Sequence, residues 1–177
     1  MDCRQPVLNS QRLTLRPFTL ADAGKVADLA GDWRIADTTE AVPHPYSHDL
    51  AEQWIISHLP AWLRREEVIF GVFNRFEAGQ LIGAIGVHGI QHSRGELGYW
   101  IGVPYWGNGY ATEAAKSVTH FCFEKLGLTE IFARHLERNP ASGRVLQKNG
   151  FTELDEIPAI WKLMEEREAT RYYRIRR

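Results

Sequence analysis

A glycine-rich stretch in the middle of the chain has the residue types needed to hold an anion. Gly107-Asn108-Gly109 follows the apolar, strand-like run Leu97–Ile101 and leads into an amphipathic helix that opens at Tyr110-Ala111-Thr112. Backbone N–H groups of such a loop can converge on a phosphate oxygen, and the helix dipole favours negative charge there. Glycine suits the loop because a side chain would stop the backbone from closing on the ligand. The sequence therefore predicts that this loop binds a phosphorylated ligand.

Neither of the common nucleotide-binding motifs fits this loop. A dinucleotide fingerprint needs a third glycine or alanine where Thr112 stands, and an acidic residue at the end of a following strand. The second feature is missing at the expected distance. A P-loop needs a Gly-Lys-Ser/Thr run, and none follows. Taken alone, Gly107-Asn108-Gly109 is also compatible with a plain turn, so the rest of the chain must decide what is bound.

The N-terminal part of the chain predicts one strand and two helices. Apolar and polar residues alternate over Arg12–Leu15, as in a half-buried strand, and Pro17 ends it. Thr19-Leu20-Ala21-Asp22 has the pattern of a capping box and starts a helix that stops near Gly31. A second helix is expected after Ser47, kinked or divided at its internal proline, Pro60. The residues expected to face inward from it are Leu50, Trp54, Ile55, Leu59 and Trp62.

The central part predicts a hairpin, a strand and the helix after the glycine loop. The hairpin joins residues 68–73 to residues 81–87 through a turn that contains Asn74 and Gly79. The next strand covers Glu96–Ile101. The helix carries apolar residues at helical spacing from Ala111 to Leu126, and the glycine at 127 is its natural stop.

The C-terminal part predicts two strands around a short helix. Residues 130–135 form the first strand, and residues 170–175 the last. Between them, Asn139 is a good N-cap, Pro140 suits the first helical position, and Gly150 ends the helix. Residues 159–168 are ambiguous between strand and helix, and the structure of 155–168 is left open.

Together these elements indicate one α/β domain over residues 1–177, with a core over about residues 10–175. The order of elements favours a mixed sheet with helices on both faces. A chain of 177 residues with an apolar fraction of 44% can bury a single sizeable core. The net charge of −1 gives no reason to expect nucleic-acid binding. The clustered C-terminal arginines are expected to be solvated.

Cysteine usage and hydropathy favour a cytoplasmic protein that does not cross a membrane. The sequence has no secretory signal and no apolar run of the length that a membrane span requires. The two cysteines, Cys3 and Cys122, are far apart and lack metal-ligand spacing. Cys122 lies on the apolar side of its predicted helix and is expected to be buried. No histidine is spaced as part of a metal site, so no metal is expected.

With these segments in this order, the sequence resembles the GNAT acetyltransferase superfamily, which binds acetyl-coenzyme A (acetyl-CoA). The family signature is Gln/Arg-x-x-Gly-x-Gly/Ala. Gly109 and Ala111 occupy its small-residue positions, and Trp106 replaces Gln/Arg. The stretch Tyr105–Ala114 is most similar to the ribosomal-protein N-terminal (RimJ/RimL-like) branch, where an aromatic residue in that position is common.

Three further segments resemble the same branch. Asn139–Phe151 is similar to its Asn-x-x-Ser…Lys-x-Gly-Phe segment, Arg12–Pro17 to its opening strand, and Pro43–Ser47 to its acceptor-side loop. Roughly residues 10 to 155 are covered. Each motif is weak alone, but the ordered set is specific.

The resemblance implies a twisted, mostly antiparallel sheet whose central strands splay apart around the pantetheine arm of acetyl-CoA. Main-chain groups of Ile101, Gly102 and Val103 would bond the pantetheine amides, and an N–H near Ile101 would polarise the thioester carbonyl. Asn139 would lie near the same arm, although an Asn before Pro is also a good N-cap whatever the function. The residues implied to hold the pyrophosphate, by the loop and the first helical turn, are Gly107, Asn108, Gly109, Tyr110, Ala111 and Thr112.

Two side chains are the candidates for proton transfer. Many superfamily members use a tyrosine to protonate the departing thiolate, but Leu146 stands at that position, and the resemblance to the ribosomal-protein branch makes Ser142 the candidate acid. A hydroxyl in the first turn of a helix is also a common polar choice. Glu96 begins the strand beside the expected thioester and is the candidate base, because an acceptor amine must lose a proton before it attacks. It is equally compatible with a solvated position, and an effective base would need burial to raise its pKa.

The resemblance further implies an N-acetyltransferase that moves the acetyl group to a primary amine by direct attack in a ternary complex. Trp33, His44 and Tyr46 lie in the segment expected to line the acceptor side, whereas Trp54 is more typical of the core. The acceptor is open among a protein N-terminus, an aminoglycoside, a polyamine and a small metabolite. A non-catalytic acyl-CoA-binding sensor is the alternative function, and both a monomer and a homodimer are compatible with the sequence.

Overall fold

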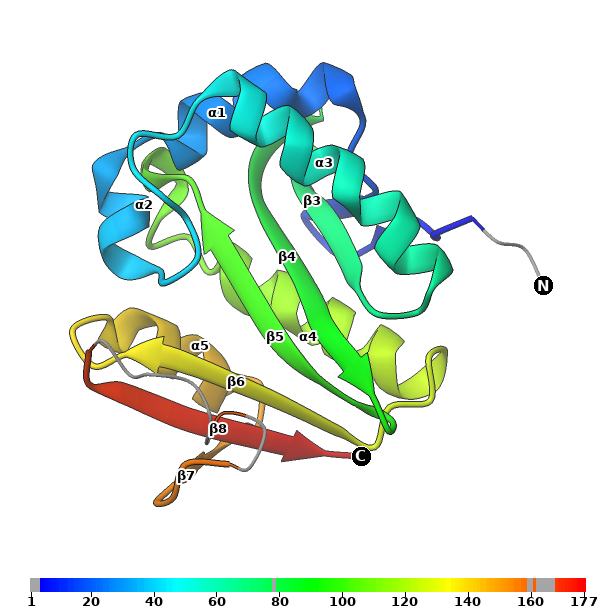
Figure 1. Cartoon of the computed structure of the whole chain (residues 1–177), viewed down its shortest axis with the longest axis vertical. Coiled ribbons are helices and arrows are strands. Elements are labelled where there is room, and N and C mark those ends of the chain that lie inside the picture. Colours follow the sequence, from blue (N-terminus) through cyan, green and yellow to red (C-terminus); the bar gives the residue numbers. More distant parts are fainter. Residues whose placement is uncertain (1–3, 78, 159–160, 162–167) are drawn as a thin grey trace.

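The computed structural model describes residues 4–77, 79–158, 161 and 168–177. Its strands form a single sheet in the order β1-β2-β3-β4-β5-β6-β8-β7 (Figure 1). The strands are β1 (Leu8–Asn9), β2 (Leu13–Arg16), β3 (Val68–Asn74), β4 (Gln80–Gln91), β5 (Arg94–Ile101), β6 (Glu130–Leu136), β7 (Thr152–Leu154) and β8 (Thr170–Arg176). Neighbouring strands run antiparallel except β5 and β6, which are parallel. The mixed, mostly antiparallel sheet expected from the sequence is confirmed.

Helices cover both faces of the sheet. They are α1 (Ala23–Ala30), α2 (Trp33–Thr38), α3 (His48–Leu63), α4 (Tyr110–Glu124) and α5 (Pro140–Lys148), with the short 3₁₀ segments η1 (Leu20–Asp22) and η2 (Val103–Tyr105). Buried side chains of α1, α2 and α3 form one core cluster with Trp100 of β5. Those of α4 and α5 belong to a larger cluster that includes Leu97 and Ile101 of the same strand. Alternate β5 side chains therefore face different helix layers, as the pleat of a strand requires.

The feature that creates a site is the split between β5 and β6. Their pairing covers Arg94 to Glu96 on β5, opposite Glu130 to Phe132 on β6. Beyond these residues the strands diverge (Figure 1), while β5 stays paired with β4 as far as Ile101. The splayed central strands expected from the resemblance are thus present, and a wedge-shaped opening faces the end of β5.

Helix α3 departs from the sequence prediction in two ways. Pro60 does not divide it: the helix runs continuously from His48 to Leu63, with the proline in its last turn. The predicted inward face is also partly wrong, since Leu50 and Leu59 are 38% and 61% exposed. Ile55 is buried as expected, and the other residues buried on α3 are Ala51, His58 and Ala61. The prediction placed the large apolar residues inside. In the structure the residues that recur at helical spacing on one face are buried instead, and most of them are small or polar.

Several smaller elements were not predicted. Helix α2 begins where Asp32 accepts a hydrogen bond from the Arg34 N–H at 3.0 Å. The short strands β1 and β7 extend the sheet at its two edges. The ambiguous segment 159–168 lies largely outside the described residues. None of the helices in the described part of the chain combines the length and apolar character that crossing a bilayer requires.

Candidate functional site

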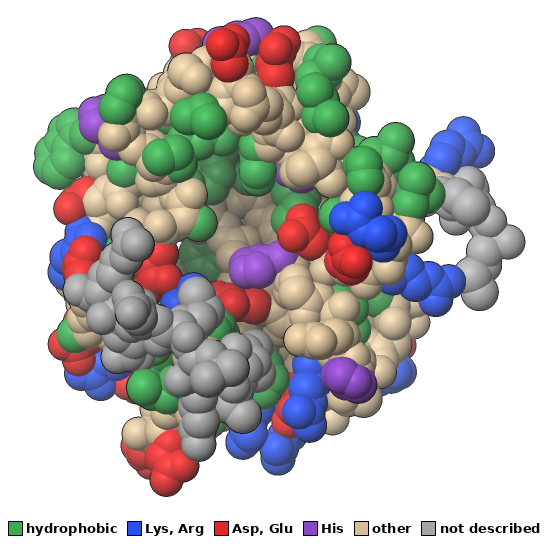
Figure 2. Space-filling view, viewed as in Figure 1, with side chains coloured by type: hydrophobic (Ala, Val, Ile, Leu, Met, Phe, Trp, Pro, Cys, Tyr) green, Lys and Arg blue, Asp and Glu red, His purple; other side chains and the backbone are tan. Residues whose placement is uncertain are grey.

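A cavity of about 820 Å³ occupies the opening between β5 and β6. On the face shown in Figure 2 the molecule is hollowed at its centre, with acidic and histidine side chains around the hollow. The cavity runs from the glycine loop to the loop that follows α2. The residues singled out from the sequence that line it are Tyr46, Glu96, Ile101, Gly107, Gly109, Tyr110, Ala111, Thr112, Asn139 and Ser142. Most of the predicted site residues are therefore brought to one place.

The glycine loop has the backbone geometry of an anion site. Gly107 and Gly109 have φ values of 79° and 78°, a left-handed conformation that favours glycine. Gly109 is the N-cap of α4 and supplies no side chain to accept from the first helical N–H groups. Those N–H groups have no partner inside the helix, so they are available to an anionic ligand.

Arg12 and Glu113 brace this loop, and no sequence pattern pointed to either residue. The Arg12 guanidinium donates to the Asn108 carbonyl at 2.9 Å and to Glu113 Oε2 at 2.7 Å. Glu113 also accepts from the Arg12 N–H at 2.7 Å, and the guanidinium lies 4.7 Å from the centre of the Tyr110 ring. The residue just before β2 thereby holds the loop from outside. The contact joins residues about a hundred positions apart, which no local pattern reveals.

Of the three residues expected to present main-chain groups to a ligand, Ile101 is the one that faces the opening. The Gly102 N–H donates to the Ile82 carbonyl of β4 at 2.8 Å, so by strand alternation the Ile101 groups point away from β4. The Ile101 carbonyl accepts from the Trp106 indole at 2.5 Å. Gly102 and Val103 accept backbone hydrogen bonds in the η2 turn and do not line the cavity. Asn108 lies outside the lining as well, so the roles expected for these three residues stay predictions.

Glu96 lies in a network of charged side chains on the α1–α3 face of the sheet. Its carboxylate accepts from Arg134 Nε at 3.0 Å and from the Trp161 indole at 2.8 Å, and it lies 3.6 Å from His88 Nε2. Arg134 also contacts Glu40 Oε2 at 2.9 Å. Burial alone would raise the pKa of Glu96, but the hydrogen bonds and charges of these neighbours lower it overall. The raised pKa that an effective base was expected to need is therefore absent, and Glu96 is held ionised.

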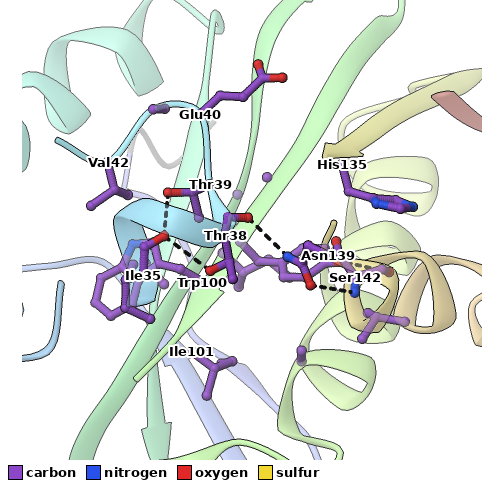
Figure 3. A pocket seen from close by; sticks show the side chains of 18 of the residues that line it. Ile35, Thr38, Thr39, Glu40, Val42, Trp100, Ile101, His135, Asn139 and Ser142 are labelled. Atoms are coloured by element: carbon purple, nitrogen blue, oxygen red, sulfur yellow. Dashed lines mark hydrogen bonds between the residues drawn. The ribbon is translucent and has the colours of Figure 1, made fainter. Parts of the chain in front are cut away.

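Ser142 lies on the opposite face, in the first turn of α5. Its N–H donates to Asn139 Oδ1 at 3.4 Å, which confirms Asn139 as the N-cap of α5. Asn139 Nδ2 donates to the Thr38 carbonyl of α2 at 3.0 Å, so one side chain joins the two elements across the opening (Figure 3). Leu146 is fully buried. The hydroxyl available from α5 at this point is that of Ser142.

The residues predicted on the acceptor side are only partly assembled. Tyr46 lines the cavity, and burial raises the pKa of its phenol. Trp33 is 60% exposed and His44 is exposed, and neither lines the cavity. Their place on the acceptor side stays a prediction.

Comparison with known proteins identifies the family. A family model described as the acetyltransferase (GNAT) domain matches residues 12–152. This chain belongs to the GNAT acetyltransferase family. It is 31% identical over 148 residues to the uncharacterized N-acetyltransferase YoaA of Bacillus subtilis, with 82% of each chain covered. The expectation of an acetyl-CoA-dependent N-acetyltransferase is thereby confirmed.

Solved GNAT structures share the fold. The ribosomal-protein-S5-alanine acetyltransferase of Vibrio fischeri superposes with a TM-score of 0.82 at 18% identity, covering 97% of both chains. RimJ of Mycobacterium smegmatis, solved with a CoA disulfide, superposes with a TM-score of 0.77 at 18% identity, covering 93% of this chain and 81% of RimJ. At this level of identity the two neighbours show that the fold is shared.

The site of this GNAT chain fits coenzyme A. The glycine loop presents N–H groups for the pyrophosphate, and the divergence of β5 from β6 leaves main-chain groups of β5 open to an extended arm. Both line the same cavity. In the described part of the chain, His48, Asp49 and Glu52 are the one group of candidate metal ligands, and they lie at the surface of α3.

Proposed function

We propose that this GNAT acetyltransferase transfers the acetyl group of acetyl-CoA directly to a primary amine in a ternary complex. One observation carries the proposal: Glu96 and Ser142 line the same cavity but come from opposite faces of the split sheet. A carboxylate on one side and a hydroxyl on the other suit a reaction that removes a proton from the nucleophile and supplies one to the leaving group.

The residues of this chain would act in four places. The glycine loop holds the pyrophosphate, and the main chain at Ile101 orients the thioester in the opening. Glu96, held ionised, attracts the acceptor ammonium and takes its proton directly or through a water. Ser142 supplies a proton as the carbon–sulfur bond breaks. Most of the rate gain would come from positioning these groups around the reacting atoms.

The burial of Cys122 favours direct transfer over a mechanism with an acyl-enzyme intermediate on this cysteine. Cys122 is fully buried in the core, and burial raises the pKa of its thiol to about 12. A thiol held protonated and away from the cavity is a poor nucleophile, because the thiolate is the reactive form.

For the acceptor, we propose the α-amine of a protein N-terminus. This choice is supported by the protein substrate named for the Vibrio fischeri neighbour. It is also compatible with the charges at the acceptor end, where Glu40 and Glu96 flank a single arginine, Arg134. An excess of carboxylates favours a cationic amine. Aminoglycosides and polyamines share that charge and are the alternatives.

A panel of acceptors tests both parts of the proposal. Thiol release from acetyl-CoA is measured with peptides bearing free N-termini, the same peptides with blocked N-termini, an aminoglycoside and a polyamine. We expect free-N-terminus peptides to give the highest kcat/KM and blocked peptides to give none. Preference for the aminoglycoside or polyamine would replace the acceptor class. Tight coenzyme A binding without turnover on any amine would favour the sensor alternative.

A further inference from the structure

Tyr99 on β5 is a buried phenol that the proposed roles leave unused. It lines the cavity, and its side chain packs against the core cluster formed with α4 and α5. Its hydroxyl lies 2.8 Å from Ser142 Oγ, a contact in which either hydroxyl can donate, and it can also donate to the Ser142 carbonyl oxygen at 3.1 Å. Because strand side chains alternate, Tyr99 faces away from Glu96 and toward the same side as Ser142. The two hydroxyls therefore form one hydrogen-bonded pair on the cofactor side of the sheet.

The chemistry of a departing thiolate makes this pair informative. A general acid works best when its pKa is near that of the group it protonates. A thiol has a pKa of about 8.5 and a free phenol of about 10, so a phenol matches a thiol more closely than an aliphatic hydroxyl does, although burial of Tyr99 widens the gap. The aliphatic hydroxyl of Ser142 is a far weaker acid and would be left as an alkoxide if it acted alone. Leu146, one turn further along α5, offers no proton.

We propose that Tyr99 and Ser142 form a two-hydroxyl relay that delivers a proton to the sulfur of coenzyme A. Ser142 Oγ passes its proton to the sulfur as the carbon–sulfur bond breaks and its electron pair moves to sulfur. In the same step Ser142 takes the Tyr99 proton, so the negative charge ends on the phenolate. Water entering the open cavity returns a proton to Tyr99 after the products leave. The proton lost by the acceptor amine balances the proton gained by sulfur.

Two features of the structure favour this assignment over a purely structural hydrogen bond. Burial raises the pKa of Tyr99, so its proton is present throughout the neutral range. The first turn of α5 is also held in place from outside the pair, because Asn139 caps it and reaches the Thr38 carbonyl. Ser142 therefore does not need the phenol to keep its position. The relay rests on the proposed function, since it supplies the acid for that reaction.

A titration of the bound thiol tests the relay without an acceptor. Ultraviolet absorbance of the thiolate gives the pKa of coenzyme A in its complex with the protein, with the desulfo-coenzyme A complex as the blank. We expect Tyr99→Phe to raise this pKa by roughly one unit, because a hydrogen bond donated to the charged sulfur is weakened. Tyr173→Phe is the matched control: this nearby phenol bonds to His135 and Glu153 and does not line the cavity. It should leave the pKa of the thiol unchanged.

Single-turnover acetyl transfer at saturating amine supplies the second readout. We expect the Tyr99→Phe rate to fall at least about tenfold, and the double variant with Ser142→Ala to be no slower than the slower single variant. The wild-type rate is also measured in mixtures of H₂O and D₂O. Its dependence on the D₂O fraction should show that two protons move in the rate-limiting step. This measurement does not depend on the folding of any variant.

The outcomes separate the relay from the proposed function. The relay would be overturned if Tyr99→Phe had the same thiol pKa and the same transfer rate as Tyr173→Phe. It would also be overturned if the rates in H₂O and D₂O mixtures showed that a single proton moves in the rate-limiting step. Loss of coenzyme A binding in Tyr99→Phe alone would also overturn it, by making Tyr99 a binding residue. A shifted thiol pKa in a protein that acetylates no amine would support the relay and reject the proposed function.

Discussion

At the residue scale, the environment of Glu96 decides what kind of base it is. Arg134 and the Trp161 indole hold its carboxylate, and His88 lies nearby. Because its pKa is lowered from the ordinary value of 4.5, the carboxylate is ionised at every pH where the reaction is measured. Its contribution is present above that pKa and disappears only as the pH falls through it. A weak base of this kind acts by attracting the ammonium and receiving its proton during attack.

Replacing Glu96 with Gln should therefore lower the transfer rate at saturating substrates by about 100-fold or more. Glu40→Gln is the comparison: it removes the other carboxylate on Arg134, so it should raise KM for the amine but keep most of the rate at saturating substrates. In the wild type, kcat/KM should rise with pH around the pKa of the acceptor amine. The midpoint of this rise should be about 8 for a peptide α-amine and about 10 for a lysine-type amine. A midpoint that stays fixed when the acceptor changes would contradict this role.

At the element scale, the junction between the glycine loop and α4 couples backbone conformation to binding. Gly109 has a φ of 78° at the N-cap of α4, beside the cavity. Gly127 has a φ of 71° just beyond the other end of the same helix and does not line the cavity. A left-handed conformation costs a non-glycine residue about 1–2 kcal/mol, and a β-branched residue suffers most. The two positions thus carry a similar backbone penalty but differ in their distance from the ligand.

This pair gives a matched test of the anion site. Gly109→Val should weaken coenzyme A binding at least about tenfold, because the side chain strains the loop and stands where the N–H groups converge. Gly127→Val should lower the melting temperature comparably and leave the dissociation constant for coenzyme A near the wild-type value. Calorimetric titration and thermal unfolding measure the two effects. Unchanged affinity in Gly109→Val would remove the loop from the pyrophosphate site.

At the scale of the whole molecule, the packing of α3 makes stability depend on pH. His58 is 7% exposed, stacks edge-on against Trp54 with ring centroids 4.5 Å apart, and lies 5.6 Å from the Phe18 ring. Neither of its ring nitrogens has a hydrogen-bond partner among the described residues. Burial lowers the pKa of His58 to about 4, against about 6.5 in an unfolded chain. Between these values the unfolded state binds more protons, so stability is lost as the pH falls from 6.5 toward 4.

The free energy of unfolding should accordingly decrease by about 2 kcal/mol between pH 7.5 and pH 5.0 on account of His58. His58→Leu, which keeps an apolar side chain in the same place, should abolish that part of the pH dependence. His120, exposed on α4, is the control, and His120→Gln should retain the wild-type decrease. Urea unfolding at the two pH values measures it. An unchanged slope in His58→Leu would show that other groups govern acid sensitivity.

The elements could be predicted from the sequence because their signals are local. The cap at Asn139 with Pro140 behind it, the alternation in β2 and the glycines around α4 each act within a few residues. The order of these elements with the glycine loop was enough to indicate the family and the cofactor. Where the prediction for α3 was wrong, the apolar residue types disagreed with the helix period, and the period prevailed.

The sequence by itself determined the main elements, their order and the position of the glycine loop, because each depends on backbone preferences of neighbouring residues. Only the tertiary structure decided which side chains meet. The register of β5 against β4 and β6 puts Glu96 with Arg134 on one face and Tyr99 with Ser142 on the other. A shift of one residue in that register would exchange the two faces. These contacts join residues dozens of positions apart, so the lowered pKa of Glu96 and the paired hydroxyls emerge only when the sheet is assembled.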